Sequence, residues 1–127
     1  MKSIISLIFI FEDKKYDQHD PEYIKILLDS HNQIPRLDLT DSYTDIKDCL
    51  KKLYNDFIRI DYDWPDKELI DCRINNSNEL EIIYKVYMPY ISDSVKSGNL
   101  INITDFPSTV LDDYYVECIT SNFRRFG

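Results

Sequence analysis

IPRLDLTDSYTDIKDCLKKLYNDFIRI, residues Ile34–Ile60, joins a polar loop to the clearest helical period in the chain. From Thr44 onward, apolar residues recur at steps of three and four, which is the spacing of a helix that buries one face. These residues are Ile46, Cys49, Leu50, Leu53, Phe57 and Ile60. The pattern predicts a helix over about residues 44–60, preceded by a loop of about eight residues that Pro35 opens.

The start of this helix is marked by hydroxyl side chains. Ser42 precedes Asp45 by three residues, which fits a capping box in which both side chains satisfy free amides of the first turn. Thr44 is an alternative cap. Either residue places the start of the helix near position 44.

The opposite face of the predicted helix is polar. Its residues are Asp48, Lys51, Lys52, Asn55, Asp56 and Arg59. Three of them, Asp48, Lys52 and Asp56, share one row with charges of alternating sign, and each ion pair along such a row contributes about 0.2–0.5 kcal/mol. A solvated surface is the simplest interpretation of this face, and a binding site is the alternative.

The loop and the helix together resemble the Nudix box, which runs Gly, five residues, Glu, seven residues, Arg-Glu, an aliphatic residue, one residue, Glu-Glu, one residue, Gly, an aliphatic residue. Setting Ile34–Arg36 on the family's aliphatic-Pro lead-in aligns the two without a gap. The Arg-Glu pair is then Lys51-Lys52, and the Glu-Glu pair is Asn55-Asp56. The glycines become Leu37 and Ile58, the first glutamate becomes Tyr43, and Leu53 keeps its aliphatic position.

Nudix enzymes are pyrophosphohydrolases of nucleoside diphosphates linked to another group, and carboxylates of this helix hold their Mg²⁺ or Mn²⁺. In this chain only Asp56 keeps a carboxylate, and Lys52 places an ammonium group where a metal-binding glutamate would stand. Hard divalent cations need oxygen ligands. The resemblance therefore implies a degenerate, non-catalytic domain with no catalytic or metal-binding residues on this helix. Its candidate ligand-binding residues are Lys51, Lys52, Asn55 and Asp56.

The resemblance also implies a fold of the α+β class, an α/β/α sandwich with a mixed sheet. The main helix at about 44–60 would cover one face, and a C-terminal helix at about 109–123 the other. In that second helix the inward residues would be Leu111, Tyr115, Cys118, Ile119 and either Asn122 or Phe123, and Thr109 with Asp112 would form a capping box. We expect one domain over residues 1–127.

The remaining apolar runs predict the strands of that sheet. Lys2–Phe11 is a nearly continuous run of Ile, Leu and Phe; it is too short to span a membrane, and the charged residues after it argue against a signal peptide, so we interpret it as a central strand. Tyr23–Leu28 predicts a second strand that ends in a turn. Residues 68–74 and 80–88 flank Asn75–Asn78 and predict a hairpin, and residues 100–103 a short strand.

Composition narrows the classes of function. The net charge is −8 and no broad basic surface is evident, so duplex nucleic acid is not an expected partner. Two glycines rule out a glycine-rich phosphate loop, and we expect no cofactor. The three cysteines include Cys49 and Cys118 on helix core faces and Cys72 in a strand, which indicates reduced, buried thiols in the cytoplasm.

Several aromatic and imidazole side chains have two interpretations. Neither His19 nor His31 has metal-ligand neighbours, so both fit loop positions better than a zinc site. The single tryptophan, Trp64, fits packing at the core or its rim better than stacking on a base. Ten tyrosines fit the coding bias of an AT-rich genome, which raises the hypothesis of a viral or phage protein acting in the host cytoplasm.

Three functional hypotheses follow. The first is a non-catalytic Nudix-like domain that acts as a protein-binding or structural subunit of an assembly. The second is a nucleotide-binding module in which Lys51 and Lys52 contact phosphates. The third is a divergent Mg²⁺-dependent hydrolase of nucleoside diphosphate derivatives that uses carboxylates outside the box. Those carboxylates would be Asp38, Asp41, Asp45 or Glu117.

Overall fold

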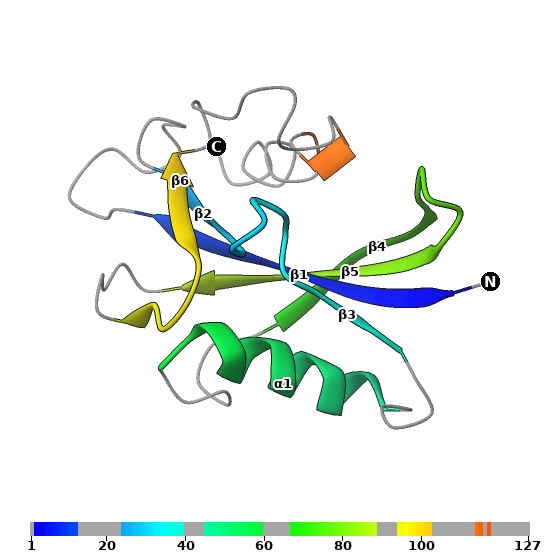
Figure 1. Ribbon diagram of the computed structural model, residues 1–127, viewed down its shortest axis with the longest axis horizontal. Coiled ribbons are helices and arrows are strands. Elements are labelled where there is room, and N and C mark those ends of the chain that lie inside the picture. The colour runs from blue at the N-terminus through cyan, green and yellow to red at the C-terminus, as the bar shows by residue number, and fades with distance from the viewer. Residues whose placement is uncertain are drawn as a thin grey trace.

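A computed structural model of the chain describes residues 2–12, 24–39, 45–59, 67–88, 94–102, 114–115 and 117. Within these ranges, six strands form one mixed sheet, and helix α1 (Ile46–Phe57) packs on one of its faces (Figure 1). The strands are β1 (Ser3–Glu12), β2 (Ile24–Leu28), β3 (Arg36–Asp38), β4 (Lys67–Ile74), β5 (Leu80–Met88) and β6 (Asn99–Asn102). A helical turn at residues 114, 115 and 117 lies on the opposite face from α1.

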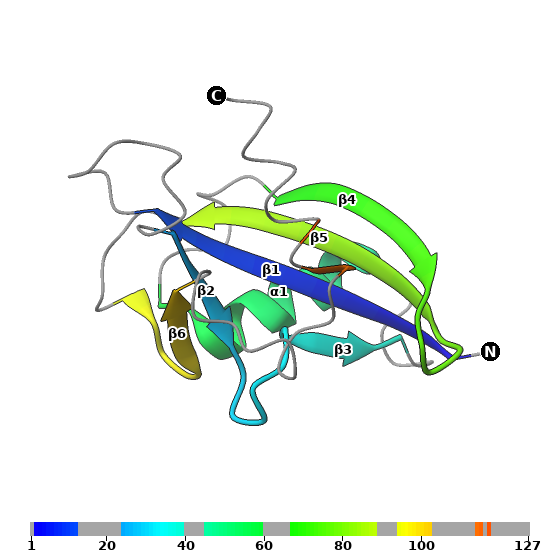
Figure 2. The same cartoon turned by 90° about the horizontal axis from the view of Figure 1, so that it is seen from above.

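Strand β1 is the centre of the sheet, as its apolar run predicts. It pairs with β5 in parallel along nearly its whole length. Its other side pairs antiparallel with β3 at the amino end and with β2 at the carboxyl end. The strand order is β4-β5-β1-β2-β6, so β4 and β6 form the two edges of this path (Figure 2).

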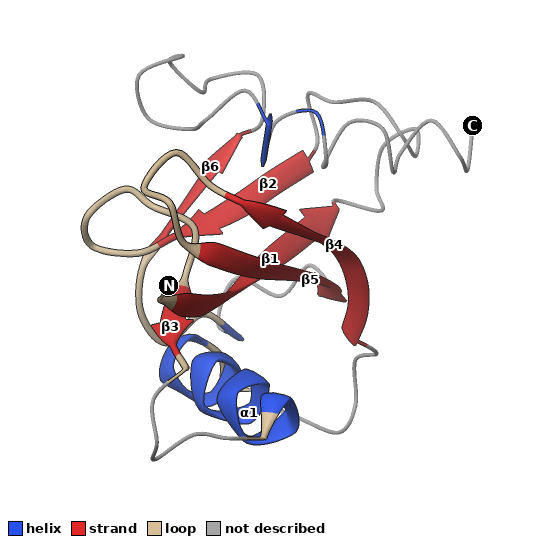
Figure 3. Ribbon diagram, turned by 90° about the vertical axis from the view of Figure 1, so that its right-hand side faces the viewer, coloured by secondary structure: helices blue, strands red, loops and turns tan. Residues whose placement is uncertain are grey.

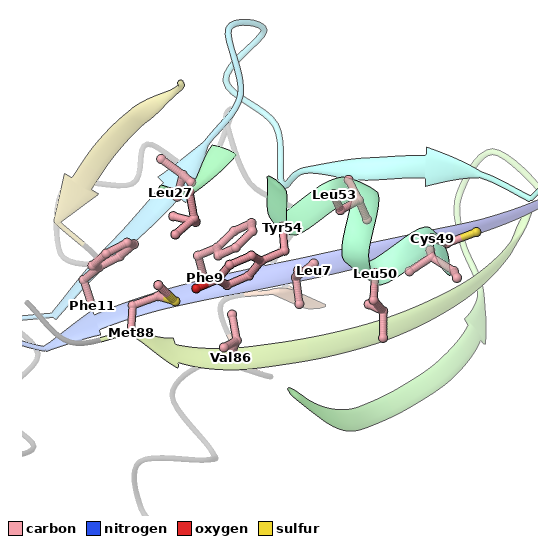
Figure 4. Close-up of a cluster of buried hydrophobic side chains, with 12 residues drawn as sticks. Leu7, Phe9, Phe11, Leu27, Cys49, Leu50, Leu53, Tyr54, Val86 and Met88 are labelled. Atoms are coloured by element: carbon pink, nitrogen blue, oxygen red, sulfur yellow. The ribbon is translucent and has the colours of Figure 1, made fainter. Parts of the chain in front are cut away.

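Both faces of β1 are buried, which explains why its sequence is a continuous apolar run rather than an alternating one. The odd-numbered residues Leu7, Phe9 and Phe11 join the core beneath α1 (Figure 4). The even-numbered residues Ile8 and Ile10 join a second core on the other face. Burial of this much apolar surface on both sides is the largest stabilising contribution to the fold.

Helix α1 confirms the predicted helix, with corrections at its ends. Asp45 is the N-cap, and its carboxylate accepts a hydrogen bond from the Lys47 backbone amide at 2.9 Å. The predicted caps Ser42 and Thr44 lie outside the described residues, as does Ile60, and the helix ends at Phe57. Among the described residues, the expected inward positions that are well buried are Cys49, Leu50 and Leu53.

The buried stripe of α1 is rotated slightly from the predicted one. The sequence predicts that Ile46 points inward, but 36% of its surface is exposed. Ile46 lies in the first turn of the helix and outside the row of buried residues. Tyr54 is fully buried instead, four residues from Leu50 and from Ile58 on the same row. Its ring lies 6.0 Å from the ring of Phe9 in β1, so an aromatic contact fastens the helix to the central strand.

The predicted loop before α1 contains a strand that the sequence did not indicate. Leu37 of β3 pairs with Ile5 of β1, and the Leu39 amide donates to the Ser3 carbonyl at 2.9 Å. A strand of three residues is too short to show an alternation of apolar and polar side chains in the sequence. It forms because this part of β1 has an edge with which it can pair. The turn before β3 is confirmed: Asp29 accepts hydrogen bonds from the amides of His31 and Gln33.

The hairpin and the short strand are confirmed. Strands β4 and β5 pair antiparallel, with a bulge between Leu69 and Asp71. Their turn contains Asn78 at a φ of 59°, a conformation that asparagine tolerates better than most residues. Strand β6 follows Gly98 at a φ of +89°, where a β-carbon would lie 2.4 Å from the Leu28 carbonyl oxygen. Glycine is therefore required at this close approach.

Some predictions fall on other parts of the chain. His19 and Trp64 lie outside the described residues, as does most of the predicted C-terminal helix. Within that helix Tyr115 is buried, in agreement with its predicted inward position. None of the helices in the described ranges is long and apolar enough to cross a membrane.

Candidate functional site

The outer face of α1 carries the candidate ligand-binding residues. Lys51, Lys52, Asn55 and Asp56 are all exposed and lie within the last two turns of the helix. Figure 3 shows this helix on one side of the sheet. The Lys52 ammonium lies 3.2 Å from the Asp56 carboxylate, as an i,i+4 ion pair. In the described ranges, Lys52 therefore pairs with Asp56 rather than with Asp48, and Asp56 already has a cationic partner.

The structure adds a cation that the sequence did not connect with this helix. Residues 94–98 lie against the carboxyl end of α1, where the Lys96 amide donates to the Phe57 carbonyl at 2.7 Å. The Lys96 ammonium donates to the Asn55 carbonyl at 3.0 Å. A cation at a helix C-terminus is favourable because it meets the exposed carbonyl dipoles. Nothing in the spacing of the sequence relates Lys96 to Asn55, which is 41 residues away.

The carboxylates outside the box do not converge with Asp56 in the described structure. Asp38 pairs with Lys2 at 3.1 Å, and this hydrogen bond and charge raise the pKa of Lys2. Asp45 caps α1, Glu117 is exposed beyond the opposite face of the sheet, and Asp41 lies outside the described residues. No group of three or more His, Cys, Asp or Glu side chains arranged to hold a metal ion occurs within the described ranges.

A buried carboxylate occupies the sheet face opposite α1. Glu81 of β5 is fully buried and accepts hydrogen bonds from the Ser6 hydroxyl at 2.6 Å and the Arg73 Nε at 2.9 Å. The Tyr115 hydroxyl donates to the same carboxylate. These donors come from β1, β4 and the helical turn. Glu81 therefore joins three parts of the chain through one carboxyl group.

Arg73 extends this network across the two tyrosines. Its guanidinium lies 3.8 Å from the ring centroid of Tyr114 and 5.1 Å from that of Tyr115, which are stacking and cation–π distances. The Tyr114 hydroxyl donates to Asp71. In the sequence, Glu81 and Lys85 alternate with apolar residues along β5, and this pattern does not show that Glu81 is buried.

Lys85 is a second charged residue on the same face, and it too is buried. Its ammonium lies 3.5 Å from the Glu68 carboxylate and donates to the Tyr87 hydroxyl at 3.2 Å. The Tyr87 ring centroid is 4.8 Å away. Both buried charges of β5 are therefore compensated by partners, as burial requires.

The two described cysteines differ in environment. Cys49 is buried in the core beneath α1, and burial raises the pKa of its thiol, with smaller effects from Asp48 and Asp45. Cys72 is exposed on β4, so the prediction that it is buried is wrong. The error has a simple cause: β4 is an edge strand, and the side of it that faces the α1 layer is not covered by the helix.

That uncovered side of β4 carries two of the three exposed large apolar side chains of the described residues. Leu69 is 57% exposed and Ile74 is 51% exposed, and both pair with β5 residues that lie on the α1 side of the sheet. Helix α1 packs mainly across β1 and β3, and β4 reaches it at Lys67, whose ammonium lies 4.8 Å from the Tyr54 ring centroid. Among the described strands β4 pairs only with β5, and a strand edge of this kind beside apolar side chains is a favourable place for another chain to bind.

Comparison with known proteins identifies the fold. No family model matches the chain, and no curated protein matches its sequence. The structure is similar to the Nudix domain of NrtR from Shewanella oneidensis, solved in complex with ADP ribose, with a TM-score of 0.64 and 10% identity over 94% of this chain and 86% of that one. It is also similar to the C-terminal domain of mouse MUTYH, solved in complex with human PCNA, with a TM-score of 0.63 and 6% identity over 98% and 90% of the two chains.

Identities this low establish the fold and leave the activity open. The mixed sheet, with α1 on one face and a helical turn on the other, agrees with the architecture that the box-like stretch predicts. The chain therefore has a Nudix-like fold of the α+β class.

Proposed function

We propose that the chain is a non-catalytic Nudix-like domain that acts as a protein-binding subunit. The observation that carries the first half of this proposal is the Lys52–Asp56 ion pair on the outer face of α1, at 3.2 Å. In the alignment with the Nudix box, these residues occupy positions of metal-binding carboxylates. Lys51, next to them, adds a second ammonium group.

A divalent cation would meet unfavourable electrostatics at this place. Mg²⁺ binds oxygen ligands and usually one or two carboxylates, with phosphate groups of the substrate completing the site. Here it would have to displace Lys52 from Asp56 and would then lie beside two ammonium groups. Repulsion between like charges a few ångströms apart opposes binding even near the surface. The face is better suited to an anion than to a metal.

The protein-binding half rests on the edge of the sheet. Strand β4 exposes Leu69 and Ile74 together with an open strand edge, and a partner could cover both at once. Binding to a protein is also compatible with this fold, since the MUTYH domain was solved in complex with PCNA.

A specific observation favours nucleotide binding as the second candidate. Lys96 lies at the carboxyl end of α1, so a third exposed ammonium group is present near Lys51 and Lys52. To contact phosphate oxygens, Lys52 would exchange its pair with Asp56, and Lys96 its bond to the Asn55 carbonyl. The NrtR domain was solved with ADP ribose, which contains a diphosphate. In this alternative the lysines would replace the metal as the partners of that group.

One set of assays separates these functions from hydrolysis. Purified protein would be incubated with ADP ribose and other nucleoside diphosphate derivatives, with Mg²⁺ or Mn²⁺, and the release of mononucleotide measured. We expect no release above that of the Asp56→Asn variant. Metal-dependent turnover that Asp56→Asn removes would refute the non-catalytic proposal.

Thermal unfolding with the same compounds tests the second candidate, because a ligand that binds the folded state raises the melting temperature. A rise with ADP ribose alone that Lys52→Ala or Lys96→Ala removes would establish phosphate binding at α1. Lys47→Ala is the matched control, since Lys47 is exposed near the other end of the same helix. An unchanged melting temperature would leave protein binding as the function of the domain.

A further inference from the structure

The open edge of β4 has a pattern that identifies a specific partner, and this inference rests on the protein-binding role proposed above. In the part of the chain that the structure describes, β4 pairs with β5 on one side and with no strand on the other (Figure 2). Leu69, Cys72 and Ile74 are exposed along it. Strand edges of this kind bind by adding one more strand through their backbone amides and carbonyls; the Cys72 amide, which donates to the Asp71 carboxylate at 2.8 Å, would exchange that bond for one to the added strand.

Pairing with β5 shows which face each β4 side chain occupies. Leu69, Cys72 and Ile74 lie opposite Tyr84, Ile82 and Leu80, on the α1 side of the sheet. Asp71 and Arg73 lie opposite Ile83 and Glu81, on the other side. Ile70 is the extra residue of the bulge, which shifts the register between Leu69 and Asp71.

A second copy of β4 matches this pattern when it runs antiparallel and Cys72 lies on the two-fold axis. Because Ile70 remains the extra residue of the bulge and has no partner, Leu69 is then opposite Ile74 of the second copy, and the two most exposed apolar side chains of the strand meet on one face. On the other face Asp71 lies opposite Arg73 of the second copy, so unlike charges face each other across the contact, while Arg73 keeps Glu81 and Asp71 keeps the Tyr114 hydroxyl within each copy. Two-fold symmetry repeats both contacts.

The neighbouring registers are unfavourable. Moving the two-fold axis to Asp71 sets two carboxylates opposite each other, and moving it to Arg73 sets two guanidinium groups opposite each other. With the axis at Leu69, Glu68 lies opposite Asp71 of the second copy. Like charges directly across a strand pair are destabilising, so among these choices the charges select the register centred on Cys72.

We propose that the protein forms a two-fold symmetric dimer in which β4 pairs antiparallel with β4 of a second copy, centred on Cys72. The contact is isologous and uses the same edge of both copies, so it closes at two subunits. A stable interface usually buries about 800 Å² per partner. One strand edge of eight residues is a smaller contact, so we expect a dimer that dissociates at micromolar concentrations.

Sedimentation equilibrium of the wild-type protein under reducing conditions is the first test. We expect reversible dimerisation, and Leu69→Lys should raise the dimer dissociation constant by about tenfold or more, because both copies lose a cross-strand apolar pair. Ile46→Lys is the matched control. Ile46 is also an exposed apolar residue, but it lies on α1, and its substitution should leave the constant unchanged.

Cross-linking tests the register. Residues directly opposite in an antiparallel pair have α-carbons about 4.5–5.5 Å apart, which lies within the range that a disulfide bridges. Mild oxidation should therefore join two chains through Cys72, as identified by peptide mass spectrometry. Cys72→Ser should abolish the covalent dimer, Leu69→Lys should slow its formation, and Ile46→Lys should not.

Three results would overturn the proposal. They are a protein that stays monomeric from micromolar to millimolar concentration, a dimer that Leu69→Lys does not weaken, and a disulfide through a cysteine other than Cys72. Circular dichroism of each variant verifies that it folds, and Leu69 is exposed enough for the monomer to tolerate lysine. Neither test involves Mg²⁺ or nucleotide, so a failure here is distinct from a finding of hydrolase activity.

Discussion

Tyr115→Phe removes one hydroxyl from the Glu81 network and leaves the shape of the buried side chain unchanged. The hydroxyl donates to a fully buried carboxylate, and hydrogen bonds to charged groups contribute about 1.5–3 kcal/mol. The free energy of unfolding should therefore fall by about that amount. Because the bond joins the helical turn to β5, the loss also weakens the attachment of that turn to the sheet.

The magnitude can be assigned to the charge of Glu81 by a double-mutant cycle. In a Glu81→Gln background the acceptor is neutral, and the same Tyr115→Phe change should cost only about 0.5–1.5 kcal/mol. The two substitutions should thus be non-additive by about 1 kcal/mol, as expected for groups in direct contact. Glu81→Ala should be the most harmful, at about 3–5 kcal/mol, because Arg73 and Ser6 lose their buried acceptor.

Urea unfolding followed by circular dichroism gives these free energies, and the slope of the transition verifies that the variants unfold in the same way. Tyr84→Phe is the matched control, since Tyr84 is half-buried on the α1 side of the same strand. It should change stability by no more than about 0.5 kcal/mol. The network would be refuted as a stabilising element if Tyr115→Phe behaved like this control, or if its cost were the same in both backgrounds.

The remaining predictions concern glycine and the cysteines. Gly98→Ala should destabilise the fold by about 1–3 kcal/mol in urea unfolding, because of its positive φ and the clash with the Leu28 carbonyl; an unchanged midpoint would contradict the close approach. In the native protein an alkylating reagent should modify Cys72 rapidly and Cys49 only on unfolding, as peptide mass spectrometry would show. The pKa of the Cys49 thiol is raised in the folded protein, so as the pH rises the unfolded chain loses the thiol proton first. The contribution of the buried thiol to folding stability is therefore complete below pH 9.0 and is lost as the pH rises above that value. The stability difference between the wild type and Cys49→Ala should therefore narrow above pH 9.0, and a constant difference would argue against burial as the cause.

The features that could be predicted from the sequence are those with a local repeat. The apolar run of β1 and the three-and-four spacing of α1 identify a buried strand and an amphipathic helix, and both are present. The polar side of α1 was predicted correctly, because a helix that buries one stripe must expose the opposite one. Asp45 was missed as the N-cap, since two hydroxyl residues just before it competed for that position.

The features that could not be predicted depend on distant pairs. Glu81 alternates with apolar residues and therefore looks like a solvent-facing side chain of a half-buried strand. Its partners are 75, 8 and 34 residues away, and only the assembled sheet brings them together. The contact of Lys96 with Asn55 is likewise invisible to local spacing, as is the exposure of Cys72, which follows from the position of β4 at the edge.

The separation between fold and candidate site explains how a Nudix-like structure can exist without the family's metal carboxylates. The stabilising contacts lie in the two cores on either side of β1 and in the Glu81 network, and none of them uses the outer face of α1. Lys51, Lys52 and Asp56 are exposed, and substitutions at such positions usually change stability by no more than about 0.5 kcal/mol. Carboxylates at these positions are therefore not needed to keep the fold. Leu69 and Ile74 of β4 remain exposed, although burying them within the monomer would be favourable. Under the proposed function, selection would act on this chain through that surface of β4.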